Sequence, residues 1–174
     1  LTPRLRFWFL LIGLFLLIET FDRIALLIWS GMTKAGIEGG LAAIFVYGFI
    51  EDAGTGLLMG LPILAALFIS RRWLRRRTGG AVAHAGLAAL CFVLAFNEAA
   101  ELLFWNEFDS RFNSIAVNYL LFPREVVGNL RESFPMHIFF PIVFVAGAAL
   151  YLLTRRSLAR ALASPSSGGE RRAA

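Results

Sequence analysis

The chain has 174 residues, 58% of them apolar and 17% charged, and its mean hydropathy of +0.69 excludes an ordinary water-soluble domain. The formal net charge of +5 is concentrated in arginine clusters that flank apolar runs, so it indicates membrane topology, and we expect no nucleic-acid partner. The single cysteine, Cys91, excludes a disulfide framework and a thiol pair for redox chemistry or metal binding.

Four apolar stretches reach the length of about 20 residues that a helix needs to cross about 30 Å of hydrocarbon. They cover residues 7–29, 41–70, 81–105 and 137–154. We therefore predict an all-α transmembrane bundle of about four spans, forming one domain over residues 1–160. Pro62 predicts a kink in the second span. The small and polar residues of 161–174 predict a flexible cytoplasmic tail or linker.

The arginine clusters predict the orientation, because positively charged flanking segments stay in the cytoplasm. Five arginines follow the second span and five follow the fourth: Arg71, Arg72, Arg75, Arg76, Arg77, Arg155, Arg156, Arg160, Arg171 and Arg172. Arg4 and Arg6 place the N-terminus on the same side. We expect a multi-pass protein of a bacterial cytoplasmic (inner) membrane with its N-terminus inside. The four tryptophans fall near predicted helix ends, where indole rings suit the headgroup layer: Trp8, Trp29, Trp73 and Trp105.

The segment over residues 106–135 is predicted to lie outside, between the third and fourth spans. Apolar residues recur every three or four positions from Phe104 to Phe122, which is typical of an amphipathic helix, and Pro123 suits the start of a second short helix. We expect both helices to lie along the outer membrane surface. They either pack on the bundle or form a docking or headgroup-binding segment. The candidate residues for the second role are Trp105, Glu107, Arg111, Asn113, Tyr119, Glu125 and Asn129.

Seven charged residues fall inside the predicted spans: Glu19, Asp22, Arg23, Glu51, Asp52, Glu98 and Glu101. A charge at the bilayer centre costs about 3 kcal/mol or more, so we expect these side chains to face the bundle interior. Glu19 and Arg23 have the i,i+4 spacing of an intrahelical ion pair, and Arg23 is the expected centre of an interhelical network. Three roles are open for this network: ion pairs that fix the packing of the helices, a polar cavity for a lipid headgroup or an ion, or a proton relay.

No arrangement of catalytic or metal-binding side chains is evident in the sequence. His84 and His137 are predicted to lie near opposite faces of the membrane, too far apart to share a metal ion. We find no combination of nucleophile, base and orienting group, and no phosphate-binding glycine loop. We therefore expect neither a catalytic residue nor a cofactor or metal in this chain.

Residues 101–135 read ELLFWNEFDSRFNSIAVNYLLFPREVVGNLRESFP. This run resembles the membrane region of bacterial phosphoglycerol transferases and sulfatase-like proteins of the lipoteichoic acid synthase type. Arg23 in the first span, with Gly48 and Asp52 in the second, looks like that family's polar positions there. The resemblance covers nearly the whole chain.

The resemblance implies a membrane anchor, usually of five helices, for an extracytoplasmic domain of the alkaline phosphatase superfamily. Such a domain uses a threonine nucleophile and a divalent metal, and no threonine of this chain takes over that role. We therefore expect a truncated chain, with a fifth helix after Ala174 leading to a catalytic domain and lipid-linked substrate outside. The alternative is a free-standing small transporter or accessory membrane subunit with an acidic intramembrane site.

Overall fold

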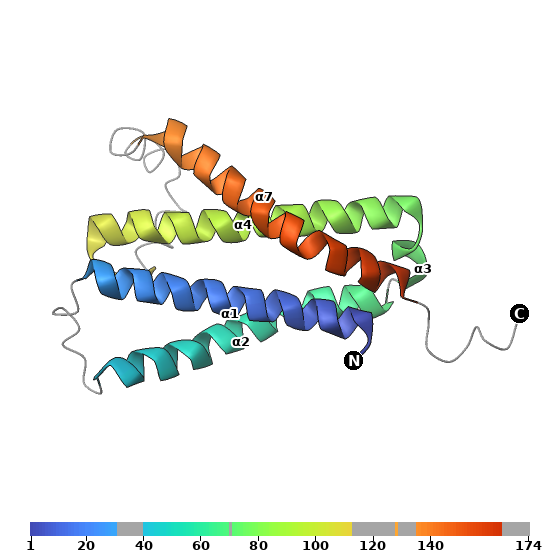
Figure 1. Cartoon of the computed structure of the whole chain (residues 1–174), viewed down its shortest axis with the longest axis horizontal. Helices are drawn as coiled ribbons and strands as arrows, with labels where there is room; N and C mark the ends of the chain where they lie inside the picture. The colour runs from blue at the N-terminus through green and yellow to red at the C-terminus, as the bar shows by residue number, and fades with distance from the viewer. Residues whose placement is uncertain (31–39, 70, 113–127, 129–134, 165–174) are drawn as a thin grey trace, which may run out of the picture.

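The computed structural model of the protein describes residues 1–30, 40–69, 71–112, 128 and 135–164, and over these residues it contains helices and no strands. The long helices are α1 (Pro3–Trp29), α2 (Gly40–Ile69), α4 (Arg77–Phe108) and α7 (Met136–Ala163), and α3 (Arg71–Leu74) is a single turn. Figure 1 shows the long helices side by side, with the N-terminus and the end of α7 at the same end of the bundle.

Three helices, α2, α4 and α7, are long and apolar enough to cross a membrane. At most 22% of the most apolar stretch of each is buried inside the bundle, and Ile69 at the end of α2 is 83% exposed. Such large apolar surfaces on single helices are stable in lipid and not in water. The all-α class and the membrane character of the protein are therefore confirmed, while four spans remain a prediction.

The first predicted helix begins earlier than its apolar run. The Thr2 side chain accepts a hydrogen bond from the Leu5 backbone N–H, and Pro3 occupies the first turn, where its missing N–H costs nothing. α1 therefore starts at Pro3 instead of residue 7.

The last predicted helix ends too early, because α7 continues nine residues past residue 154. The extension includes three arginines, Arg155, Arg156 and Arg160, which end an apolar run but are good helix formers. Residues 161–163, predicted as tail, belong to α7, and residues 165–174 lie outside the described residues. α2 continues as one helix through Pro62.

Small residues bring α2 close to α1. The buried residues Gly48, Asp52, Gly56 and Gly60 recur every four positions and so line one face of α2. A Cβ atom at Gly60 would lie 2.8 Å from Nε1 of Trp8, and the Trp8 indole N–H donates to the Gly60 carbonyl at 2.8 Å. This spacing of small residues is the usual means of close helix contact in membranes.

The opposite pair of helices, α4 and α7, also meets at a glycine. A Cβ atom at Gly147 would lie 3.1 Å from Cα of Phe92, so the two backbones are close there. Arg4 links α1 to the end of α7, because its guanidinium donates to the carbonyls of Ala161 and Ser164, at 3.3 Å each. A cation at a helix C-terminus satisfies carbonyls that have no partner in the helix.

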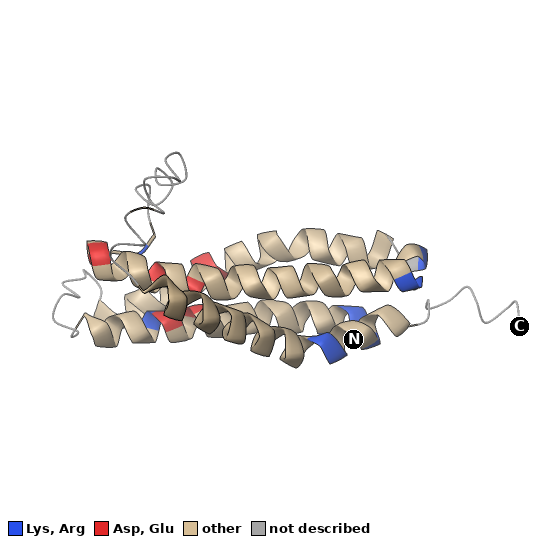
Figure 2. Ribbon diagram, turned by 90° about the horizontal axis from the view of Figure 1, so that it is seen from above, with Lys and Arg blue, Asp and Glu red and all other residues tan. Residues whose placement is uncertain are grey.

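The charged side chains are separated along the bundle (Figure 2). Described acids gather toward the end opposite the N-terminus, and residues 53–97 contain no Asp or Glu at all. The arginines around α3 and near the N-terminus lie at the other end. The protein therefore has an acidic end and a basic end, which are the outer and inner ends in the predicted topology.

The prediction that one amphipathic helix runs without interruption from Phe104 through Phe112 is wrong. α4 ends at Phe108, and Asp109 adopts a left-handed conformation (φ 50°) with its N–H bonded to the Trp105 carbonyl. The rest of the predicted interfacial segment, residues 113–127 and 129–134, lies outside the described residues.

We expect Gly60→Val to destabilise the protein because the added side chain would meet the Trp8 indole. Overpacking of this kind costs about 1–3 kcal/mol, and thermal unfolding of the purified protein in detergent, followed by circular dichroism, should show a lower Tm. Gly54→Val is the matched control, since a Cβ atom at Gly54 meets nothing within 4 Å. Equal Tm values for the two variants would contradict the close contact of α1 with α2.

Candidate functional site

Arg111 is the centre of a charged cluster that joins α1 to α4. Its guanidinium lies 2.5 Å from a carboxylate oxygen of Glu101, 3.2 Å from Glu19 and 3.5 Å from Asp22. The three carboxylate side chains are only 5%, 10% and 5% exposed, whereas the Arg111 side chain is 35% exposed. One partly exposed cation therefore lies against three buried acids.

The end of α4 determines where Arg111 lies. The left-handed Asp109 turns the chain back after Phe108, so the following residues return toward the helix they have just left. The ring of Phe112 packs against the buried Phe104, with centroids 5.2 Å apart, and Phe108 packs on the same ring at 4.6 Å. This aromatic group holds the chain on both sides of Arg111 against α4.

Glu19 and Asp22 reach the same guanidinium because they are three residues apart on α1 and so share one face of the helix. Opposite charges in contact strongly favour the charged forms. Burial lowers the pKa of Arg111, but the hydrogen bond and charge of Glu101, with the charge of Asp22, outweigh it and raise that pKa above its usual value. Arg111 is therefore cationic at every physiological pH.

A second ion pair joins α1 to α2. Arg23 donates to a carboxylate oxygen of Asp52 at 2.9 Å, and both residues are buried. The guanidinium of Arg23 lies on the α2 backbone at Gly48, where a Cβ atom would fall 2.2 Å from its central carbon. Gly48 is therefore needed for the guanidinium to reach this position.

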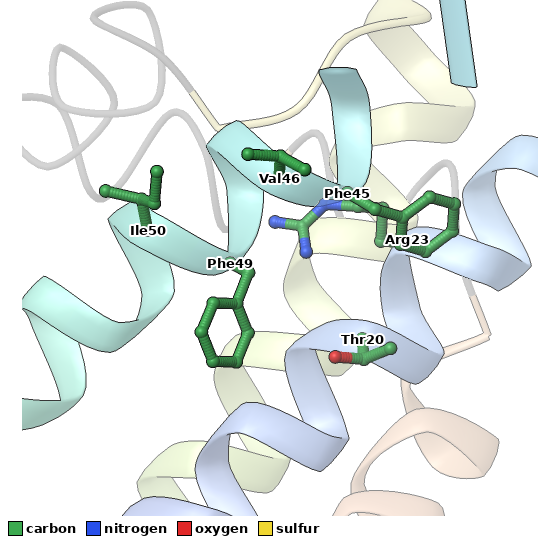
Figure 3. Close-up of a pocket in the computed structure, with 6 residues that line it drawn as sticks. All are labelled: Thr20, Arg23, Phe45, Val46, Phe49 and Ile50. Atoms are coloured by element: carbon green, nitrogen blue, oxygen red, sulfur yellow. The ribbon is translucent and has the colours of Figure 1, made fainter. Parts of the chain in front are cut away.

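An open pocket of about 390 Å³ lies beside this ion pair. Figure 3 shows Thr20 and Arg23 of α1 together with residues of α2 that complete the lining: Phe45, Val46, Phe49 and Ile50. The lining is almost wholly apolar, so Arg23 supplies its main polar group.

Among the described residues, acids outnumber cations in this region. Two described cations, Arg23 and Arg111, lie among five described acids: Glu19, Asp22, Asp52, Glu98 and Glu101. Both carboxylate oxygens of Glu98 are buried and lack a hydrogen-bond partner among the described residues, as does the Trp105 indole N–H. Buried polar groups usually have partners, so Glu98 is a candidate for proton or cation binding.

The structure places the predicted intramembrane residues in two groups instead of one. The prediction that Arg23 is the centre of the network is wrong for the described contacts, since Arg23 pairs with Asp52 while Arg111 binds the other acids. The expected Glu19–Arg23 pair is replaced by the contact of Glu19 with Arg111. Arg23 pairs with Asp52 of α2, whereas Glu19 pairs with Arg111, which lies beyond the end of α4.

The predicted outer docking residues are described only in part. Trp105 and Glu107 belong to the last turns of α4, with Glu107 exposed, and Arg111 follows the turn. Asn113, Tyr119, Glu125 and Asn129 lie outside the described residues. On α2, Glu51 is exposed, unlike its neighbour Asp52.

Within the part of the chain that the structure describes, no three His, Cys, Asp or Glu side chains are arranged to hold a metal ion. His84 instead lies 3.2 Å from the Tyr151 hydroxyl, between α4 and α7. Cys91 lies 3.9 Å from the Thr154 hydroxyl, which itself donates to the Leu150 carbonyl. These groups join helices and form no nucleophile with an activating base.

No protein family matches the chain, and no solved structure matches it. Function therefore has to be inferred from the residues themselves.

We expect Arg111→Met to destabilise the bundle strongly, because three buried carboxylates would lose their shared cation and repel one another. Removing one partner of a buried ion pair costs about 3–5 kcal/mol, and the partial exposure of Arg111 places the expected loss near the lower value. Thermal unfolding in detergent at neutral pH measures the loss. Lowering the pH should recover part of it, since neutral carboxyl groups no longer repel.

Arg155→Met is the matched control for this measurement, because Arg155 is exposed on α7. A Tm for Arg111→Met equal to that of the control at neutral pH would show that the acids are stable without Arg111. Arg111→Lys should fall between the two, since it keeps the charge but loses the forked geometry.

Proposed function

We propose that this chain is the membrane anchor and positioning domain of a sulfatase-like or phosphoglycerol transferase-like enzyme. The observation that carries the proposal is the place of Arg111, which belongs to the run resembling that family and is bound by acids of α1 and α4. The start of the outer segment is thereby attached to two helices. A rigidly held segment is what a domain that positions another domain requires.

In this proposal the outer segment, residues 106–135, contacts the extracytoplasmic catalytic domain or the headgroup of a lipid-linked substrate. The catalytic threonine and the divalent metal belong to that domain, which is not part of these 174 residues. The present chain supplies attachment, orientation and a fixed height above the membrane. Fixing a reacting group close to its substrate contributes to rate without chemistry by the anchor itself.

The proposed topology has four spans, α1 included, with the basic end in the cytoplasm of a bacterial cell. It is supported by the gathering of arginines at one end of the bundle (Figure 2). Although α1 contains Glu19, Asp22 and Arg23, these side chains are buried against other helices and bound by opposite charges. Paired charges that face the bundle interior are compatible with a span.

A second candidate function is a free-standing transporter or accessory subunit that uses the acidic region as an ion or proton site. It is favoured by the buried carboxylate of Glu98, which has no hydrogen-bond partner among the described residues, and by the excess of acids among those residues. The reading frame separates the two proposals: several hundred codons for a metal-dependent hydrolase domain after Ala174 support the anchor. A stop codon directly after Ala174 supports the free-standing protein.

We expect Arg111→Gln in the full-length enzyme to lower turnover of a lipid-linked substrate about tenfold or more, because the outer segment would lose its attachment. Hydrolysis of a small soluble ester should stay unchanged, since the catalytic domain itself is intact. Arg155→Gln, at an exposed position of α7, is the control and should affect neither reaction. Equal loss of both activities in Arg111→Gln, or loss of neither, would contradict a positioning role.

We expect reporter fusions at positions 75 and 157 to lie in the cytoplasm, and fusions at positions 30 and 110 to lie outside. A phosphatase reporter active only outside and a fluorescent reporter active only inside measure this at each site. Because α1, which contains Glu19, Asp22 and Arg23, is the one proposed span that is not among the three candidate membrane-crossing helices, the position 30 fusion is the critical one. An inactive phosphatase at position 30, with an active one at position 110, would remove α1 from the spans.

A further inference from the structure

An apolar cavity of about 430 Å³ lies at the basic end of the bundle. It is lined by side chains from five helices, and its floor is formed by buried core residues: Phe7, Leu67, Leu74, Leu87 and Leu158. The cavity exists because α1 packs along α2 and α7, and α7 along α4, while α2 and α4 hardly touch over their described residues. Its volume falls in the range of about 300–1,000 Å³ that is usual for ligand sites.

The cavity is partly open to the outside of the bundle. Trp73 and Val82, which also line it, are 43% and 55% exposed, so they form its rim. Gly86 lies on the same rim, and a Cβ atom there would meet nothing within 4 Å. A side chain at position 86 would therefore project into open space at this rim.

Three exposed arginines flank the rim residue Trp73 in the sequence. Arg72 precedes Trp73, and Arg76 and Arg77 follow within four residues, all three exposed. Residues 53–97, which include α3 and the first part of α4, contain no Asp or Glu. An apolar cavity with a cationic rim at the membrane surface is complementary to an amphiphile with an apolar chain and an anionic head.

We propose that this cavity binds one acyl chain of an anionic phospholipid, whose phosphate is held by the arginines beside Trp73. Basic pockets between membrane helices on the cytoplasmic side bind anionic headgroups in this way. The lipid would fill the space between α2 and α4 and join the two helices. The proposal requires that α2 and α4 lie in a membrane, but it does not depend on any catalytic domain.

Native mass spectrometry of the purified chain, in detergent with equal amounts of phosphatidylglycerol and phosphatidylcholine, tests the site. We expect one tightly held phosphatidylglycerol, and a preference over phosphatidylcholine that falls about fivefold for each arginine removed in Arg72→Gln and Arg76→Gln. Gly86→Leu should abolish the tight binding by filling the cavity. Gly54→Leu, at another position with open space, should leave it unchanged.

Tryptophan quenching provides a measurement that does not depend on the folding of Gly86→Leu. In vesicles of phosphatidylcholine with a small fraction of brominated phosphatidylglycerol, the wild-type chain should be quenched more than Trp73→Phe. Trp29→Phe, which removes an exposed tryptophan at the other end, should retain the quenching.

Three results would overturn the proposal. Equal retention of the two lipids would show that the rim does not select charge, and unchanged binding in a folded Gly86→Leu would place the lipid elsewhere. A dimer whose formation is abolished by Gly86→Leu would show that a second copy fills the cavity.

Discussion

The arrangement of the bundle depends on keeping charged side chains away from lipid. An unpaired charge near the bilayer centre costs about 3 kcal/mol or more, yet Glu19, Asp22 and Glu101 all lie well inside long apolar helices. Each is buried and is bound by Arg111, which approaches from beyond the end of α4. The usual order of a soluble protein is thus reversed, with charges inside and large apolar side chains outside. The need to cover these acids links α1, α4 and the turn that carries Arg111 in one structural unit.

Close helix contact is the second requirement, because an ion pair between helices forms only where the backbones allow the side chains to meet. Gly48 gives the Arg23 guanidinium its place on α2, one turn before Asp52. Gly60 accepts the Trp8 indole on the same face. The glycines of α2 and Asp52 are spaced four residues apart and so lie on one face of the helix. That face therefore allows α1 to approach closely and also supplies the negative charge that binds Arg23. A bulkier residue at Gly48 would displace the cation that Asp52 needs.

The helices could be predicted from the sequence because apolar runs of about 20 residues have few alternatives, whereas the partners of the charges could not. Arg111 lies 89 and 92 residues from its partners on α1, and local spacing favours Arg23 as the partner of Glu19 instead.

The end of α4 could not be predicted from the sequence for a related reason. Phe112 keeps the four-residue spacing of Phe104 and Phe108, but it contacts Phe104 across a turn, so the repetition reflects contact with one ring and not a continuous helix. A visible sign of the turn was the Asp-Ser pair at residues 109 and 110, residues that favour helix ends over helix interiors.

α1 is the helix whose position follows most directly from its polar contacts. At its basic end Arg4 binds the last carbonyls of α7, and toward its other end Arg23 binds Asp52 of α2. Its charges make it the least suited of the long helices to lie alone in lipid, so its stability in a membrane depends on the other helices. The dependence is mutual. Glu101 of α4 shares Arg111 with the acids of α1, so moving α1 away would leave Arg111 with fewer partners. Asp52 of α2 would at the same time lose its ion pair with Arg23. A displacement of Arg111 would therefore change the packing of α1 against both α2 and α4.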